Sequence, residues 1–183
     1  SRHGEVTRVE TDILMIGRLA PEKNHSEAIR ALAMLPQRHL TIVGAGPEEA
    51  NLRALVTALD ISDRVSFAGL LTNNEVVREM QNSKLLLITS LTEALPMVLL
   101  EGLANAHKIL VSRISAHRFA YENELVGSYE IGNMAELVAK VNQLAIEQPS
   151  KALNVRRREV LGEYSESRVF GQWVQSISTI ANK

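Results

Sequence analysis

The sequence contains no cysteine. This absence excludes disulfide bonds, zinc sites built on thiolates and catalytic thiols, and it is compatible with a reducing compartment. Aromatic residues make up only 4% of the 183 residues, which is too few for the stacking platforms that bind single-stranded nucleic acid. The formal net charge of −1 also lacks the basic excess typical of nucleic-acid binding. We therefore expect no nucleic-acid partner.

Long apolar runs and metal-binding patterns are missing as well. No apolar run approaches the roughly 18–20 residues that cross a bilayer, and the first residues carry no signal-peptide core. The five histidines have no close metal-ligand spacing, and the three aspartates form no D-x-D pair, so we predict no metal site. No P-loop or G-x-S-x-G motif is present. We expect a cytoplasmic protein without a bound metal.

The hydrophobic pattern predicts one α/β domain over residues 1–183. Short apolar runs alternate with stretches of helical period, which is typical of a parallel sheet covered by helices. The fold class is therefore a Rossmann-like, doubly wound parallel sheet of about six strands, with helices on both faces and further C-terminal helices. The expected strands are 12–19, 39–45, 64–69, 84–90, 108–113 and 128–132. The expected helices are 25–35, 48–60, 73–82, 97–106, 134–147, 150–163 and 166–181.

The loop after the first expected strand reads "GRLAPEKN" and carries two cations, Arg18 and Lys23. Ligands of doubly wound sheets bind beyond the carboxyl ends of the strands, where this loop should lie. A guanidinium fork and an ammonium group suit a diphosphate. The alternative is that both are surface charges paired with Glu22.

The segment "GAGPEEA" after the second strand contains Gly44 and Gly46 but is not a dinucleotide-binding motif. Glu49 occupies the third glycine position of G-x-G-x-x-G and Glu48 adds a second acid, so both would repel a pyrophosphate. The glycines are expected to allow a tight turn and a close approach of backbone to a ligand.

The loop after the fourth strand and the helix that follows it read "SLTEALPMVLLEGLA", with Glu93 and Glu101 on either side of an apolar segment. If the helix begins near Pro96, both carboxylates can face one small molecule. The alternative is that Glu93 is an acid favoured at a helix N-terminus and Glu101 a solvated helix residue. We place His25, at the start of an earlier helix, on the surface or in a cap.

Taken in order, "GRLAPEKN", "LTIVGAGPEEANLRAL" and "VSFAGLLTNNEVVREMQNSKLLLITSLTEALPMVLLEGLA" resemble the C-terminal, donor-binding half of glycosyltransferase family 4, the retaining enzymes of GT-B architecture. The resemblance implies that Glu101 binds the ribose of a nucleotide diphosphate sugar and that Glu93 lies near the transferred sugar. Arg18 and Lys23 would bind the diphosphate, which makes Glu93, Arg18 and Lys23 the catalytic set. The resemblance also implies that the loop near Phe67–Leu70 holds the base of the nucleotide, mostly through its backbone. No metal or other cofactor is implied. The complete expected donor-binding set is Gly17, Arg18, Lys23, Gly44, Gly46, Phe67, Gly69, Leu70, Glu93, Ala94, Leu95, Pro96, Val98 and Glu101.

The resemblance also implies partners outside this sequence. These are a UDP-sugar donor, an N-terminal domain that is absent here, and a glycan or lipid-linked acceptor in polysaccharide or glycoconjugate biosynthesis. Any attachment to the inner face of the membrane would be made through that absent domain, and the isolated domain is expected to be inactive. The loop after Ser112 departs from the family pattern, so no contacts are carried over to it. A non-catalytic nucleotide-binding or interaction module and a nucleotide-sugar epimerase of the same architecture remain alternatives.

Overall fold

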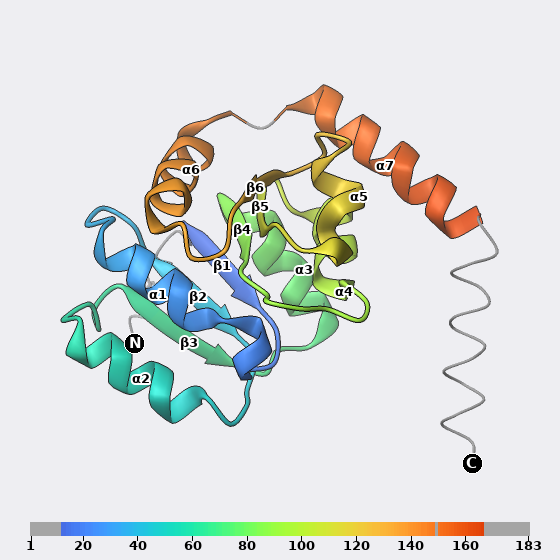
Figure 1. The fold of residues 1–183 in the computed structure, drawn as a ribbon. Helices are drawn as coiled ribbons and strands as arrows, with labels where there is room; N and C mark the ends of the chain where they lie inside the picture. The colour runs from blue at the N-terminus through green and yellow to red at the C-terminus, as the bar shows by residue number, and fades with distance from the viewer. Residues whose placement is uncertain (1–11, 149, 167–183) are drawn as a thin grey trace, which may run out of the picture.

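A computed structural model describes residues 12–148 and 150–166 of the chain (Figure 1). Its centre is a six-stranded sheet in the order β3-β2-β1-β4-β5-β6, and every neighbouring pair of strands is parallel. This is the strand order of a doubly wound Rossmann-like sheet, so the predicted fold class is confirmed. The strands are β1 Ile13–Ile16, β2 Leu40–Val43, β3 Val65–Gly69, β4 Leu85–Ile88, β5 Ile109–Ser112 and β6 Gly127–Tyr129.

Helices cover both faces of this sheet. Residues of α1, α2 and α6 pack into one hydrophobic cluster with the sheet, whereas residues of α3, α4, α5 and α7 pack into a second cluster on the opposite face. The α-helices are α1 His25–Ala33, α2 Glu49–Ala58, α3 Asn73–Asn82, α4 Met97–Asn105, α5 Arg118–Tyr121, α6 Met134–Ile146 and α7 Lys151–Glu166. Two 3₁₀ turns, Pro21–Lys23 and Ser115–His117, precede α1 and α5.

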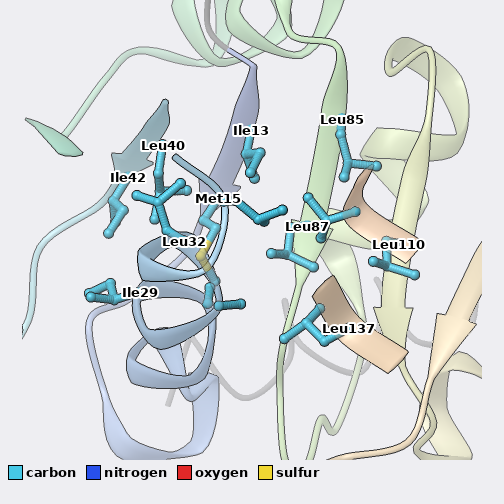
Figure 2. Packing of buried hydrophobic residues seen from close by; sticks show 14 of the residues in the cluster. Ile13, Met15, Ile29, Leu32, Leu40, Ile42, Leu85, Leu87, Leu110 and Leu137 are labelled. Atoms are coloured by element: carbon cyan, nitrogen blue, oxygen red, sulfur yellow. The ribbon is translucent and has the colours of Figure 1, made fainter. Parts of the chain in front are cut away.

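The central strand β4 shows how the side chains of one short apolar run pack into both hydrophobic clusters. Side chains alternate across a strand, so Leu85 and Leu87 of β4 join the first cluster while Leu86 and Ile88 join the second. All four are buried, which is why the run is continuously apolar instead of alternating. Figure 2 shows the first cluster, in which Leu32 of α1 and Leu137 of α6 face the strands.

The C-terminal helix α7 packs along α4. One residue anchors it: Arg157 is almost completely buried, and its guanidinium donates hydrogen bonds to the carbonyls of Leu125, Ala106 and His107 at 2.8, 3.0 and 3.2 Å. Burial lowers the pKa of Arg157 to about 10. The helix expected over 150–163 is therefore present, and it packs against the domain.

Several predicted bounds differ from the structure. The first expected strand, 12–19, contracts to Ile13–Ile16, because the buried Leu19 belongs to a packed loop and not to the sheet. The single-turn helix α5 was not predicted, since four residues are too few to show a helical period. The expected helix over 166–181 lies outside the described residues, apart from its first position.

At the amino ends of the strands, Asp12 forms a cluster of ionic contacts. Its buried carboxylate accepts hydrogen bonds from Lys84 Nζ at 2.9 Å and from the His39 backbone N–H at 3.2 Å. Arg38 Nη1 lies 3.8 Å and His39 Nδ1 3.6 Å from the same group. These residues precede β1, β2 and β4, so the cluster ties together the three strands at the centre of the sheet.

Candidate functional site

The strand order reverses between β1 and β4, and the loops after these two neighbouring strands meet at the carboxyl edge of the sheet. In open α/β sheets this switch point is where ligands bind. Main-chain hydrogen bonds first join the loop after β1 to the segments after β2 and β3. They run from the N–H of Gly17 to Val43 O, of Leu19 to Ala45 O, of Gly44 to Gly69 O and of Glu48 to Leu19 O.

The predicted glycines make this junction possible. Gly44 has a φ of +137°, and a Cβ placed on it would lie 1.9 Å from the carbonyl oxygen of Gly17. A Cβ on Gly46 would lie 2.3 Å from Leu19 O, which is closer than any side chain tolerates. The close approach expected at these positions therefore exists, but it is an approach to the backbone of a neighbouring loop. Contact of Gly17, Gly44 or Gly46 with a ligand stays a prediction.

The loop that carries Lys23 is fixed from two further sides. Thr89 Oγ1, just past β4, lies 2.8 Å from the carbonyl oxygen of Lys23 and 3.0 Å from that of Asn24. Asn24 has a left-handed φ of 50°, and its side-chain amide donates to Glu27 Oε2 at 2.8 Å. The backbone under Lys23 is thus held in place before any ligand arrives.

Lys23 and Glu93 form an ion pair at the switch point. The distance from Lys23 Nζ to Glu93 Oε1 is 2.6 Å, and Ser90 Oγ donates to the same oxygen at 2.7 Å. The Glu93 side chain is 10% exposed and that of Lys23 22% exposed. Two sequence-predicted residues that are 70 positions apart therefore meet, and Lys23 pairs with Glu93 and not with Glu22.

Arg18 lies in the same loop as Lys23, and its side chain is exposed. Within residues 12–148 and 150–166, no hydrogen bond or ion pair engages its guanidinium. The structure therefore does not contain the alternative pairing of Arg18 with Glu22. One loop at the carboxyl edge therefore carries two cations, of which Lys23 is paired and Arg18 has no partner among the described residues.

The predicted base-binding segment lies at the end of β3. Phe67 is half-buried within the strand, and the guanidinium carbon of Arg53 lies 4.3 Å from the centroid of its ring. Gly69 ends the strand with a φ of +69°. Leu70 follows with 80% of its surface exposed, so an apolar side chain borders the backbone that was predicted to hold a base.

The remaining predicted residues lie in the turn before α4 and in the first turns of that helix. Pro96 is buried at the N-cap, with Met97 as the first helical residue. Ala94 is exposed, whereas Leu95 and Val98 are half-buried. Glu101 is exposed one turn into α4, so its carboxylate is available to a ligand, as the ribose prediction requires. Its exposure fits the alternative of a solvated helix residue equally well.

Three polar residues near Glu93 were not predicted. His117 Nδ1 lies 2.9 Å from the carbonyl of Ser112, the last residue of β5. The hydroxyl of Ser112 donates to Ser90 O at 2.6 Å, and Ser90 in turn holds Glu93. The available sequence signal was a serine at or just past the end of each of two buried strands. It places Ser90 and Ser112 at the functional edge but does not place His117 there.

Burial also separates two histidines from the solvent. His25 was expected on the surface or in a cap, and this was wrong: it is buried at the first position of α1. Burial, and to a lesser degree the charge of Lys23, lowers the pKa of His25 to about 4. Burial likewise holds the pKa of His117 below its ordinary value. Both rings are therefore neutral at pH 7.

The buried carboxylate of Glu27, on α1, connects the loop after β1 with the end of β6. Glu27 accepts hydrogen bonds from the Tyr129 hydroxyl at 2.9 Å and from the Gly132 N–H at 2.7 Å, in addition to the one from Asn24. Burial raises the pKa of Tyr129, and the neighbouring Glu27 raises it further. The loops after β1 and β6 are thus joined through one side chain on α1.

In the described part of the chain, no group of three histidine, aspartate or glutamate side chains is arranged to hold a metal ion. Among the same residues, no helix has the length and apolarity needed to cross a membrane.

Residues 6–168 match the family described as glycosyl transferases group 1. The chain belongs to this family. The match covers most of the sequence, including the whole switch-point edge, so the resemblance deduced from the loop motifs is confirmed at the level of the family.

Individual relatives agree with this assignment. An uncharacterised glycosyltransferase of Haemophilus influenzae is 29% identical over 169 residues, which is 88% of this chain and 47% of that protein. The lipopolysaccharide core biosynthesis glycosyltransferase LpsE of Rhizobium meliloti is 25% identical over 91% of this chain and 49% of its own length. The chain thus spans about half the length of these relatives.

A solved structure shows the same fold. HepE of Anabaena, crystallised with UDP and glucose, superposes with a TM-score of 0.72 at 20% identity, covering 95% of this chain and 49% of HepE. The chain therefore has the fold of about half of HepE.

Proposed function

We propose that this chain is the donor-binding, C-terminal half of a retaining glycosyltransferase that takes a hexosyl group from a UDP-sugar. The observation that carries the proposal is the Lys23–Glu93 ion pair at the switch point, with the unpaired Arg18 in the same loop. A protein that used this edge only for packing would have no need of an exposed cation, without a partner among the described residues, in the loop whose lysine binds a nearly buried carboxylate. Membership of the group 1 glycosyl transferases supports the same proposal.

The diphosphate would bind between the two cations. Arg18 is free to form a bidentate contact, and Lys23 can share its ammonium between Glu93 and a phosphate oxygen. Negative charge develops on the leaving diphosphate during transfer, so fixed positive groups there lower the barrier. In this proposal Arg18 and Lys23 supply the charge compensation without a metal ion.

The nucleoside would extend from the diphosphate along the edge. Glu101 would accept the ribose hydroxyls, and the backbone over Phe67–Leu70 would hold the base. Two observations support these roles: Glu101 is exposed, and no atom lies within 4 Å of a Cβ placed on Gly69. Residues Ala94–Val98 would line the donor between its two ends.

Glu93 would lie beside the transferred sugar. Its charge is balanced by Lys23 and its orientation is set by Ser90, so it can oppose the positive character that develops on the sugar ring in an oxocarbenium-like transition state. The acceptor, a glycan or a lipid-linked molecule, would be brought by the rest of the full-length protein. The role of LpsE in lipopolysaccharide core biosynthesis supports a place in polysaccharide or glycoconjugate biosynthesis.

Calorimetry on this chain tests the binding half of the proposal. We expect weak binding of UDP, in the high micromolar to millimolar range, because half of the cleft is missing and preorganisation is reduced. Lys23→Met or Arg18→Ala should weaken UDP binding about tenfold or more while leaving uridine binding unchanged, since each removes a charge-assisted contact. Glu101→Ala should weaken UDP and uridine alike, because it acts on the ribose.

Lys84→Met is the matched control, because Lys84 is also ion-paired but lies at the opposite, amino edge of the sheet. It should leave UDP affinity unchanged. No detectable binding of any nucleoside diphosphate at millimolar concentration would refute the proposal, and equal losses for uridine and UDP on Lys23→Met would refute the diphosphate role.

Transfer is tested on the full-length protein with UDP-sugars and analysis of the product anomer. Glu93→Gln should lower kcat by at least about a hundredfold with little change in donor Kd, because it keeps the shape of the carboxylate but removes its charge. Retained configuration is the expected outcome. Donor binding without transfer to any acceptor would favour the non-catalytic module, and interconversion of two UDP-sugars would favour the epimerase.

A further inference from the structure

The loop after β5 contains a chain of contacts that ends at Glu93. Its first member is His117, which is fully buried and joined through Nδ1 to the carbonyl of Ser112. The hydroxyl of Ser112 holds the carbonyl of Ser90, and the hydroxyl of Ser90 holds Glu93 Oε1. The segments after β4 and β5, the two strands that follow the switch point, are therefore connected by side chains.

The contact with a carbonyl determines the tautomer of His117. A carbonyl oxygen can only accept, so Nδ1 must carry the proton, and the neutral ring then leaves a bare lone pair on Nε2. Nε2 is buried and has no partner within the described residues. A buried polar atom without a partner costs about 1–3 kcal/mol, and such atoms call for an explanation beyond packing.

The need to provide a hydrogen bond to the carbonyl of Ser112 does not explain why a histidine occupies position 117. The carbonyl of Ser112 already accepts a hydrogen bond from the N–H of Ile114 at 3.0 Å, so an apolar side chain in place of the imidazole would leave no unpaired oxygen and would avoid the orphaned Nε2. What the imidazole adds is a second, directional bond that fixes the end of β5, from which the Ser112 hydroxyl reaches Ser90.

We propose that His117 is a positioning residue for Glu93: its Nδ1–H fixes Ser112, Ser112 fixes Ser90, and Ser90 holds the Glu93 carboxylate against Lys23. The catalytic consequence rests on the proposed function, whereas the orientation of Glu93 does not. The loop after Ser112 is therefore a supporting part of the site, although its sequence departs from the family pattern.

Nitrogen NMR of the histidine rings in the unmodified chain tests the first link. The shifts of His117 should be those of a neutral ring protonated on Nδ1 at pH 7. A ring protonated on Nε2 would overturn the proposal, because Nδ1 could then not donate to Ser112.

Stability measurements without any ligand test the rest of the chain of contacts. His117→Ala and Glu93→Ala, the second of which leaves the Ser90 hydroxyl without its acceptor, should be non-additive, with the unfolding constant of the double variant differing at least about twofold from the product of the single effects. His117→Asn places an amide N–H near the position of Nδ1 and should restore most of the coupling, whereas His117→Gln, whose amide lies near Nε2, should not. Additive effects, or rescue by glutamine but not asparagine, would overturn the proposal.

Kinetics of the full-length protein give the functional readout. His117→Ala should lower kcat about tenfold or more with the Kd for UDP unchanged, because misplacement of a reacting group by a fraction of an ångström lowers turnover before it lowers donor affinity. His117→Asn should recover most of this loss. An unchanged kcat in an active His117→Ala enzyme would overturn the proposal. Absence of transfer in the wild-type protein would instead refute the proposed function, and the ligand-free coupling would still decide the role of His117.

Discussion

The neighbouring strands β1 and β4 carry a lysine–carboxylate pair at each end, and the two pairs are built differently. At the amino end, Asp12 pairs with Lys84 at 2.9 Å, the backbone N–H of His39 donates to it at 3.2 Å, and Arg38 Nη1 lies 3.8 Å away. At the carboxyl end, Lys23 pairs with Glu93 at 2.6 Å, and the only other donor to that carboxylate in the described residues is the hydroxyl of Ser90.

The difference shows where charge is used for folding and where it is kept available. The amino end gathers two cations and a histidine around one buried carboxylate, so its charges hold strands together. The carboxyl end is held by main-chain bonds between loops and by neutral hydroxyl groups, so Arg18, Lys23 and Glu93 are not needed to close it. Four variants test this comparison, in order of decreasing expected effect.

The largest effect is expected from Gly44→Ala, which attacks the main-chain junction at the carboxyl end. The new Cβ would lie 1.9 Å from Gly17 O on a backbone with a φ of +137°, so clash and backbone strain act together. We expect a loss of about 3 kcal/mol or more in the free energy of unfolding, measured by urea denaturation.

Gly132→Ala is the control for Gly44→Ala, because its φ is also positive, at +82°, but no atom lies within 4 Å of the added methyl group. It should cost about 1 kcal/mol from backbone strain alone. Equal costs for the two variants would mean that contact between the loops does not hold the carboxyl end.

Next in size is Asp12→Asn, which attacks the charge cluster at the amino end. It should lower the free energy of unfolding by about 2 kcal/mol, because Lys84 and Arg38 lose the negative charge that they face. Denaturant titration measures the loss. Glu49→Gln, which breaks an exposed pair with Arg53, is the control and should cost no more than about 0.5 kcal/mol. A cost for Asp12→Asn as small as this would remove the distinction between the two ends.

A pH-dependent effect is expected from His25→Gln under the carboxyl-end loop. The pKa of His25 is lowered to about 4 in the folded protein, whereas the unfolded chain binds the proton near pH 6.5. The unfolded state therefore binds more protons than the folded state between these pH values. The contribution of the neutral His25 ring to the stability of the folded protein is complete above pH 6.5 and is lost as the pH falls towards 4. As the pH falls from 6.5 to 4, the free energy of unfolding of the wild type should decrease by about 2 kcal/mol relative to that of His25→Gln.

Thermal unfolding at several pH values measures the effect of His25→Gln. At pH 8 the ring is neutral in both states, so this measurement gives the pH-independent effect of the substitution and serves as the reference. Parallel curves for the two proteins from pH 6.5 to 4 would contradict the buried, neutral state of His25.

The smallest effect is expected from the double variant Lys23→Met/Glu93→Gln at the carboxyl end. Replacing both members of a largely buried pair by neutral groups of similar shape is often neutral or stabilising, and glutamine can still accept from Ser90. We expect a change within about 1 kcal/mol by urea denaturation. A loss as large as that from Asp12→Asn would show that this pair holds the fold and is not kept available for a ligand.

Most of the fold could be predicted from the sequence because both faces of the sheet are covered. Strands buried on both faces are continuously apolar, as in "LLLI" of β4, and such runs are recognisable without a structure. The strand ends were less predictable, since Leu19 and Val43 are equally buried although one lies in a loop and the other in a strand. Burial determines which residue types a segment contains, whereas the main-chain hydrogen bonds determine where a strand begins and ends.

Part of the candidate site could likewise be predicted from the sequence, and part depends on tertiary contacts. The loops of Lys23 and Glu93 could be placed at one edge, because the carboxyl ends of parallel strands share an edge, but the ion pair itself depends on tertiary contacts over 70 positions. His117 could not be found, since its link to Glu93 passes through a backbone carbonyl and two serines that no spacing rule connects. His25 was wrongly placed because its neighbours along the chain are polar, whereas its burial depends on tertiary packing.

The main-chain junction at the carboxyl edge has a consequence for the timescale on which this surface moves. Amides in loops commonly exchange with solvent through local opening at almost no free-energy cost. Here the N–H groups of Gly17, Leu19, Gly44 and Glu48 are bonded between segments, so they should exchange as slowly as those of the sheet. A ligand that reaches this edge would meet a surface already ordered, and little conformational entropy would remain to be lost on binding.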